Sequence, residues 1–108
     1  MIGSRLLACV LLPAALFCSP RALVAVHQPF RCVNWDGSGQ GLADEMAAAC
    51  GYPSVATVGY ATPGSFGSRY GVDLGLEVIT LELPRPATDE DYTACVRALE
   101  CARLYRAG

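Results

Sequence analysis

The chain has 108 residues, of which 53% are hydrophobic and 17% charged, and its formal net charge is −2. This length suits one small domain, and this composition excludes a disordered segment or a highly charged linker. Such a weak charge gives no electrostatic footprint for nucleic acid, and no polybasic run indicates an anionic membrane surface. We therefore expect a globular domain and predict neither nucleic acid nor a membrane as its partner.

Residues 1–20 form an apolar leader of uncertain origin. Arg5 precedes an apolar run over residues 6–18, which is too short to span a bilayer comfortably but has the length of the hydrophobic region of a signal peptide. The residues from Phe17 to Arg21 fit a cleavage site poorly. A signal peptide, an uncleaved anchor and an artefactual N-terminus stay open. We favour a truncated or mis-started reading frame, with the domain proper in residues 21–108.

Six cysteines raise the question of disulfide bonds or bound metal. No C-x-x-C pair occurs, and the spacing does not suit a zinc ribbon. We favour free, mostly buried thiols in a reducing compartment, which predicts a cytoplasmic protein. Export is the alternative if residues 1–20 act as a signal.

The chain's one histidine follows a predicted buried strand. Ala22 to Val26 is a short continuous apolar run, which is typical of a buried parallel strand, and Pro29 ends it soon after His27. Ligands of open α/β sheets bind beyond the carboxyl ends of strands. His27 is therefore a candidate ligand-binding residue, although a lone histidine is more often structural.

The middle of the chain predicts a loop, a helix, a short strand and a second loop. Turn formers fill residues 30–41, which we interpret as a loop. Apolar residues at helical spacing predict a helix over Leu42–Cys50, with Gly51 as its stop. A brief strand is expected over Val55–Val58. The long glycine-rich loop Gly59–Gly75 lacks the lysine of a phosphate-binding loop.

A second apolar strand carries one carboxylate. Val78–Leu83 reads as a strand in which Ile79, Leu81 and Leu83 share one face and Glu82 lies on the other. A buried carboxyl is a candidate general base, and the alternative is a strand-end glutamate that faces solvent or pairs with an arginine.

The C-terminal segment predicts a capped helix. Thr88 is a suitable N-cap, followed by three acids in the first turn and a helix that runs to about Tyr105. Its predicted inward stripe consists of Tyr92, Cys95, Leu99 and Ala102. These elements together predict an α/β fold, with an incomplete mixed sheet and flanking helices.

Three motifs in this order resemble the zinc carboxypeptidase family, which includes the murein peptide amidases. They are Ala-Val-His27-Gln-Pro-Phe, Gly-Tyr60-Ala-Thr-Pro-Gly-Ser and Ile-Thr-Leu-Glu82-Leu-Pro. The resemblance runs from about Arg21 to the C-terminus and implies the C-terminal part of a catalytic domain. It implies that His27 is a zinc ligand, that Tyr60 is a mobile residue closing over the substrate, and that Glu82 is the general base and acid.

The same resemblance implies hydrolysis of a peptide amide, in the murein amidases the γ-D-glutamyl–diaminopimelate bond of a cell-wall peptide. Arg69 or Arg85 is then a candidate contact for an anionic substrate, although a solvated surface arginine is the simpler interpretation of each. An ordinary carboxypeptidase or a deacylase on the same scaffold is a further possibility.

The chain also departs from the family pattern. The family's His-x-x-Glu and Asn-Arg motifs, which supply two zinc ligands and a substrate-binding arginine, are absent from the sequence. We therefore expect zinc for the complete family domain but an inactive, truncated form here. The alternative function is that of a small secreted, disulfide-bonded binding protein.

Overall fold

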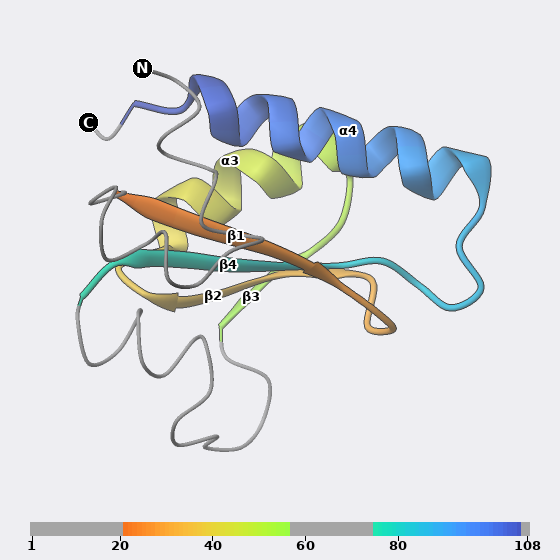
Figure 1. Ribbon diagram of the computed structural model, residues 1–108, viewed down its shortest axis with the longest axis horizontal. Helices are drawn as coiled ribbons and strands as arrows, with labels where there is room; N and C mark the ends of the chain where they lie inside the picture. Colours follow the sequence, from red (N-terminus) through yellow and green to blue (C-terminus); the bar gives the residue numbers. More distant parts are fainter. Residues whose placement is uncertain (1–20, 57–74, 107–108) are drawn as a thin grey trace.

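The computed structural model describes residues 21–56 and 75–106 of the chain. Within these residues, four strands form one mixed sheet, and two helices lie on the same side of it (Figure 1). The elements in chain order are β1 (Ala22–His27), β2 (Cys32–Gly37), α3 (Gln40–Cys50), β3 (Ser54–Ala56), β4 (Glu77–Glu82) and α4 (Asp89–Leu104). The predicted α/β class and mixed sheet are confirmed.

The strand β4 lies inside the sheet, whose strand order is β1-β4-β2-β3. It runs parallel to β1 and antiparallel to β2, and β2 runs parallel to β3. A strand with neighbours on both sides has its backbone hydrogen bonds satisfied and both faces available for burial. This position explains why five of the six residues of β4 are buried, on both faces of the strand, as the sequence predicted.

The sheet has two faces of different character. On the face toward the helices, Val24, Val33, Ile79 and Leu81 join the main hydrophobic core. The helices contribute buried side chains to the same core, namely Leu42, Ala43, Met46, Ala94 and Ala98. The alternation of side chains in a strand sends the intervening residues, among them Asn34, Thr80 and Glu82, to the opposite face.

The helix α3 matches its prediction closely. It ends where Gly51 adopts a left-handed conformation, with φ of 82°, and the Gly51 N–H donates to the Ala47 carbonyl. A residue with a Cβ adopts this conformation at a cost, so glycine is the favoured helix stop here. The following strand β3 covers only part of the predicted Val55–Val58, whose last two residues lie outside the described ranges.

The predicted loop over residues 30–41 was wrong, because β2 occupies its centre. Val33 and Trp35 alternate with Asn34 and Asp36, which is the period of a half-polar strand. The polar residues of this alternation are also common turn formers. Pairing with β4 along the whole of β2 outweighs that local preference.

The helix α4 begins and ends as predicted, with Thr88 as its N-cap in a capping box with Asp91. Its predicted inward stripe was wrong at Tyr92, which is 57% exposed. Ala94 and Ala98 face the core instead. Most contacts of α4 are with α3, and these small side chains allow the two helices to approach closely.

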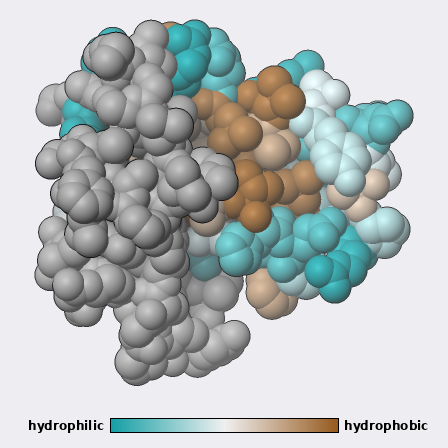
Figure 2. Space-filling model, viewed as in Figure 1, coloured by the Kyte–Doolittle hydropathy of each residue, from teal (hydrophilic) through white to brown (hydrophobic). Residues whose placement is uncertain are grey.

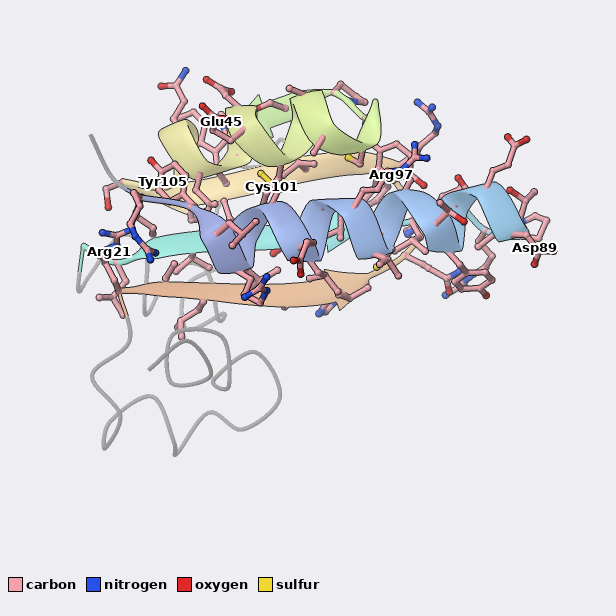
Figure 3. The ribbon with its side chains drawn as sticks, turned by 90° about the horizontal axis from the view of Figure 1, so that it is seen from above. Arg21, Glu45, Asp89, Arg97, Cys101 and Tyr105 are labelled. Atoms are coloured by element: carbon pink, nitrogen blue, oxygen red, sulfur yellow. The ribbon has the colours of Figure 1, made fainter. Side chains whose placement is uncertain are left out.

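The amino-terminal ends of β1 and β4 are joined to the end of α4 through Arg21. Figure 3 shows Arg21 and Tyr105 close together at one end of the sheet, far from Asp89 at the start of α4. The Arg21 Nε lies 3.3 Å from a Glu77 carboxylate oxygen, and its guanidinium lies 5.7 Å from the centre of the Tyr105 ring. Arg21 Nη2 also donates to the Tyr105 carbonyl at 3.5 Å.

Several large hydrophobic side chains remain exposed in the described residues. Figure 2 shows hydrophobic side chains gathered near the middle of the face seen in Figure 1. The exposed large hydrophobic residues are Val26, Phe30, Tyr92, Val96 and Leu104. Within residues 21–56 and 75–106, neither helix is both long and apolar enough to cross a membrane.

Candidate active site

The strand β1 places His27 at the edge of the described sheet, at the carboxyl end of the strand. Ala22, Leu23 and Val24 are buried, whereas His27 is exposed. The backbone there is fixed to the end of β4, because the Leu83 N–H donates to the His27 carbonyl at 2.9 Å. The next side chain along, Gln28, donates from Nε2 to the Pro84 carbonyl at 3.1 Å.

The strand β4 places Glu82 between His27 and Cys32. Glu82 is the cross-strand partner of His27 in the parallel pairing with β1 and of Cys32 in the antiparallel pairing with β2. Direct cross-strand partners lie on the same face of a sheet. The three side chains therefore form one row on the face away from the helices, which we call the polar face.

The carboxylate of Glu82 is buried, and one of its oxygen atoms has no hydrogen-bond partner among the described residues. Glu82 is 6% exposed, and its Oε1 atom accepts no hydrogen bond within the described ranges. Burial raises the pKa of the Cys32 thiol, and the nearby negative charge of Glu82 raises it further. The row thus combines a buried carboxylate that has unused acceptor capacity with a solvent-accessible imidazole, which suits proton transfer from a bound water.

A second row on the polar face contains Ala25, Thr80 and Asn34. Thr80 is the partner of Ala25 on β1 and of Asn34 on β2. Asn34 is 5% exposed, and its Oδ1 atom has no hydrogen-bond partner among the described residues. Sequence reasoning missed Asn34 because the segment was interpreted as a loop. The alternation of Val33, Asn34, Trp35 and Asp36 is the signal that could have found it.

A cavity of about 430 Å³ lies beside His27. Its lining residues are Val26, His27, Gln28, Leu83, Arg85 and Tyr92. Arg85, a candidate contact for an anionic substrate, is thus placed beside His27. The prediction that His27 and Glu82 face one cavity holds only in part, because they share the polar face but Glu82 is not among these lining residues.

Two predicted residues lie outside the described ranges. These are Tyr60, predicted to close over the substrate, and Arg69, predicted as a cationic contact. Their roles stay predictions.

The described residues do not fit a complete zinc site. They contain no group of three His, Cys, Asp or Glu side chains arranged to hold a metal ion. The whole sequence has one histidine, whereas catalytic zinc needs three protein ligands and an open position. His27 is exposed at a strand end and available as one ligand, so the remaining ligands have to come from elsewhere.

A second cavity, of about 410 Å³, lies at the start of α4 and is organised by Tyr52. The Tyr52 hydroxyl donates to Asp91 at 2.6 Å, and the Arg31 guanidinium lies 4.7 Å from the centre of the Tyr52 ring. Burial and the hydrogen bond to Asp91 raise the pKa of Tyr52 well above its usual range. The hydrogen bond from Tyr52 and those from Thr88 lower the pKa of Asp91. These contacts connect three segments of the fold. The polar groups involved already have partners in one another, so the cavity is better explained by a structural role than by ligand binding.

Comparisons with known proteins point to one group. The chain is 42% identical to murein peptide amidase A of Escherichia coli strain K12 over 71 residues. The matched segment covers 66% of this chain and 28% of that protein. The murein peptide amidase A of Escherichia coli O157:H7 gives the same values. The crystal structure of murein-tripeptide amidase MpaA from Escherichia coli O157 matches 91% of this chain and 41% of its own, with 30% identity and a TM-score of 0.64. The chain is related to the murein peptide amidases. No protein-family model matches it.

The relationship to the murein peptide amidases confirms the fold that the motifs implied, which is part of a zinc carboxypeptidase-like domain. The chain spans less than a third of the length of the curated amidases it matches. The alternative of a secreted, disulfide-bonded binding protein is not favoured. In addition, the four cysteines of the described part, Cys32, Cys50, Cys95 and Cys101, are free thiols.

Proposed function

We propose that this chain supplies part of the active site of a peptide amidase that acts on cell-wall peptides. The observation that carries the proposal is the cross-strand pairing of His27 with Glu82 on the polar face. Two residues predicted to act on the same bond, far apart in sequence, are neighbours in the fold. The similarity to murein peptide amidases supports the reaction class.

In this proposal, Glu82 moves the protons. Its carboxylate takes a proton from the water that attacks the amide carbonyl, and then gives that proton to the leaving amine. Its buried Oε1 atom, which has no hydrogen-bond partner within the described ranges, supports this role, because this oxygen has acceptor capacity left for the water. We assign to Tyr60 the role of a mobile hydroxyl that shields the bound substrate from solvent.

We further propose that His27 is one zinc ligand and that residues 1–108 alone neither retain zinc nor hydrolyse amides. A single imidazole falls short of the three ligands that catalytic zinc requires. The substrate that we propose is the amide between γ-D-glutamate and diaminopimelate, with Arg85 beside His27 as the contact for an anionic group. We place the protein in the cytoplasm, and the free thiols of the described part support that placement.

A chimaera tests the proposal. Residues 21–108 would replace the matching segment of murein peptide amidase A from Escherichia coli, and purified protein would be assayed for zinc content and for hydrolysis of γ-D-glutamyl-diaminopimelate. We expect about one zinc per chain and measurable hydrolysis. The unmodified chain, residues 1–108, should lose zinc on dialysis and show no hydrolysis.

Two variants of the chimaera separate the proposed roles. His27→Ala should lower the zinc content, whereas Glu82→Gln should keep the zinc and reduce hydrolysis by a factor of at least about 100. A folded chimaera that binds zinc but retains its activity with Glu82→Gln would rule out the proposed role of Glu82. Stoichiometric zinc on the unmodified chain after dialysis would contradict the incomplete site.

A further inference from the structure

The polar face of the sheet has an apolar end. Leu23 on β1 and Val78 on β4 are direct cross-strand partners, at the opposite end of the two strands from His27 and Glu82. Alternation places Leu23 and Val78 on the polar face, and neither belongs to the main core between the sheet and the helices. Yet both are 0% exposed. Other atoms must therefore cover this end of the face.

No described helix or strand lies over that end. Both helices pack on the other side of the sheet (Figure 1), and the described connections lie at the ends of strands and helices. The cover over Leu23 and Val78 therefore comes from residues 1–20 or 57–74, because the only other residues outside the described ranges are Ala107 and Gly108.

Residues 1–20 suit this cover better by composition. The apolar run over residues 6–18 contains no charged or hydroxyl side chain, whereas residues 57–74 include Arg69, Asp73 and several glycines. Packing apolar side chains against Leu23 and Val78 removes apolar surface from water on both sides, whereas burying an unpaired charge there is costly. The two buried side chains therefore match the apolar run.

The apolar run also joins the fold at the correct end of the sheet. Residue 20 leads directly into Arg21 and β1, so the run ends a few residues before Leu23. Even as an α-helix, residues 6–18 would be about 20 Å long, which is about the length of a six-residue strand. The apolar run is therefore long enough to reach both Leu23 and Val78.

We propose that the apolar run over residues 6–18 docks on the polar face of the sheet, over Leu23 and Val78, and is part of the folded domain. This assigns the run a role in folding in place of export or membrane anchoring. The inference does not depend on the proposed function, because it concerns the end of the strands away from His27 and Glu82.

The two cysteines within the apolar run, Cys9 and Cys18, test the proposal on the full chain. The protein would be labelled with iodoacetamide at pH 8, with and without urea, and the labelled peptides followed by mass spectrometry. We expect both thiols to react at least about ten-fold more slowly in the folded chain, because burial shields a thiol and raises its pKa. Reaction at the unfolded rate would overturn the proposal.

Protection of the two thiols has to be intramolecular. The labelling rates would therefore be measured at two protein concentrations, and we expect them to be equal. Faster labelling on dilution would show that self-association covers the apolar run, and would also overturn the proposal.

A matched pair of substitutions locates the docking surface. Val78→Asp places a charge under the proposed site and should raise the labelling rates of Cys9 and Cys18 toward the unfolded values. Val96→Asp makes the same change on α4, where Val96 is 65% exposed, and should leave both rates unchanged. Release of the two thiols by Val96→Asp but not by Val78→Asp would place the apolar run on the helical side and overturn the proposal.

Cys101 reports whether the rest of the domain stays folded. It lies on α4, on the other side of the sheet, and its labelling rate should not change in either variant. If Val78→Asp unfolds the whole chain, Cys101 also reacts at the unfolded rate, and Val78→Ala takes its place. This milder change should accelerate labelling of Cys9 and Cys18 alone. Equal acceleration at all three thiols, or none at any of them, would overturn the proposal.

Discussion

Glu77 and Glu82 begin and end the same strand, are both buried, and lie on opposite faces of the sheet, but among the described residues only Glu77 of the two has an ion pair. The carboxylate of Glu77 contacts Arg21 at 3.3 Å, whereas Glu82 Oε1 accepts no hydrogen bond within the described ranges. One strand thus holds a carboxylate whose ion pair stabilises the fold and a second carboxylate with an oxygen atom that has no hydrogen-bond partner among the described residues.

This contrast predicts opposite effects of the same substitution. Glu82→Gln removes a buried charge and should raise the free energy of unfolding by roughly 1 kcal/mol. Glu77→Gln removes a partly exposed ion pair and should lower it by about 1 kcal/mol at most. Urea denaturation at neutral pH measures both. A loss of stability in Glu82→Gln would mean that the carboxylate has a structural role.

The reactivity of Cys32 should report the charge of Glu82. Because the negative charge of Glu82 helps to raise the pKa of the Cys32 thiol, Glu82→Gln should lower that pKa and increase the thiolate fraction at a given pH. Iodoacetamide labelling at pH 8, followed by mass spectrometry, should therefore show faster modification of Cys32 in the variant. The labelling rate of Cys101, whose raised pKa does not involve Glu82, is the internal control.

The hydrogen bond between Tyr52 and Asp91 should make stability depend on pH at both extremes. Because the pKa of Asp91 is lowered in the folded chain, its contribution is present above about pH 3.9 and is lost as the pH falls through the folded value. Because the pKa of Tyr52 is raised, its contribution is present below about pH 10 and is lost as the pH rises further.

Tyr52→Phe tests this account, because it removes the hydroxyl but keeps the ring. At pH 7 the variant should unfold at a lower midpoint urea concentration than the unmodified chain. The difference between the two midpoints should become smaller at pH 3. A difference of equal size at both pH values would argue that the hydroxyl acts through packing.

Gly51 should be hard to replace. Its φ of 82° lies in the left-handed region, and a Cβ built there would meet no atom within 4 Å, so any cost comes from the backbone alone. We expect Gly51→Ala to lower the free energy of unfolding by about 1 kcal/mol, and Gly51→Asn to cost less. Thermal unfolding monitored by circular dichroism compares the two. Equal stability of all three proteins would contradict this explanation of how α3 ends.

The sequence was informative where one local pattern dominated. The apolar runs of β1 and β4 and the capping residues around α3 and α4 each predict one element, and those elements formed nearly where expected. The motifs around His27 and Glu82 gave more information than any single element, because they indicated a relationship that the comparisons confirm. The pairing of β1 with β4 follows from no local pattern and had to come from the structure.

Failures occurred where local preference and long-range packing disagree. Asn34 and Asp36 favour turns in isolation, yet pairing with β4 holds them in β2. Tyr92 has helical spacing suited to the core, but Ala94 and Ala98 allow the closer approach to α3 and take its place. Asn34 escaped notice as a candidate site residue for the first of these reasons.

The position of β4 between β1 and β2 has a consequence for how the chain is made. Among the described strands, β1 pairs only with β4, so its backbone groups stay without their sheet partner until residue 82 has left the ribosome. Pairings between distant segments form slowly and leave strand edges open to other chains in the meantime. The same strand order that brings an imidazole beside a carboxylate therefore predicts that this part of the sheet forms late in folding.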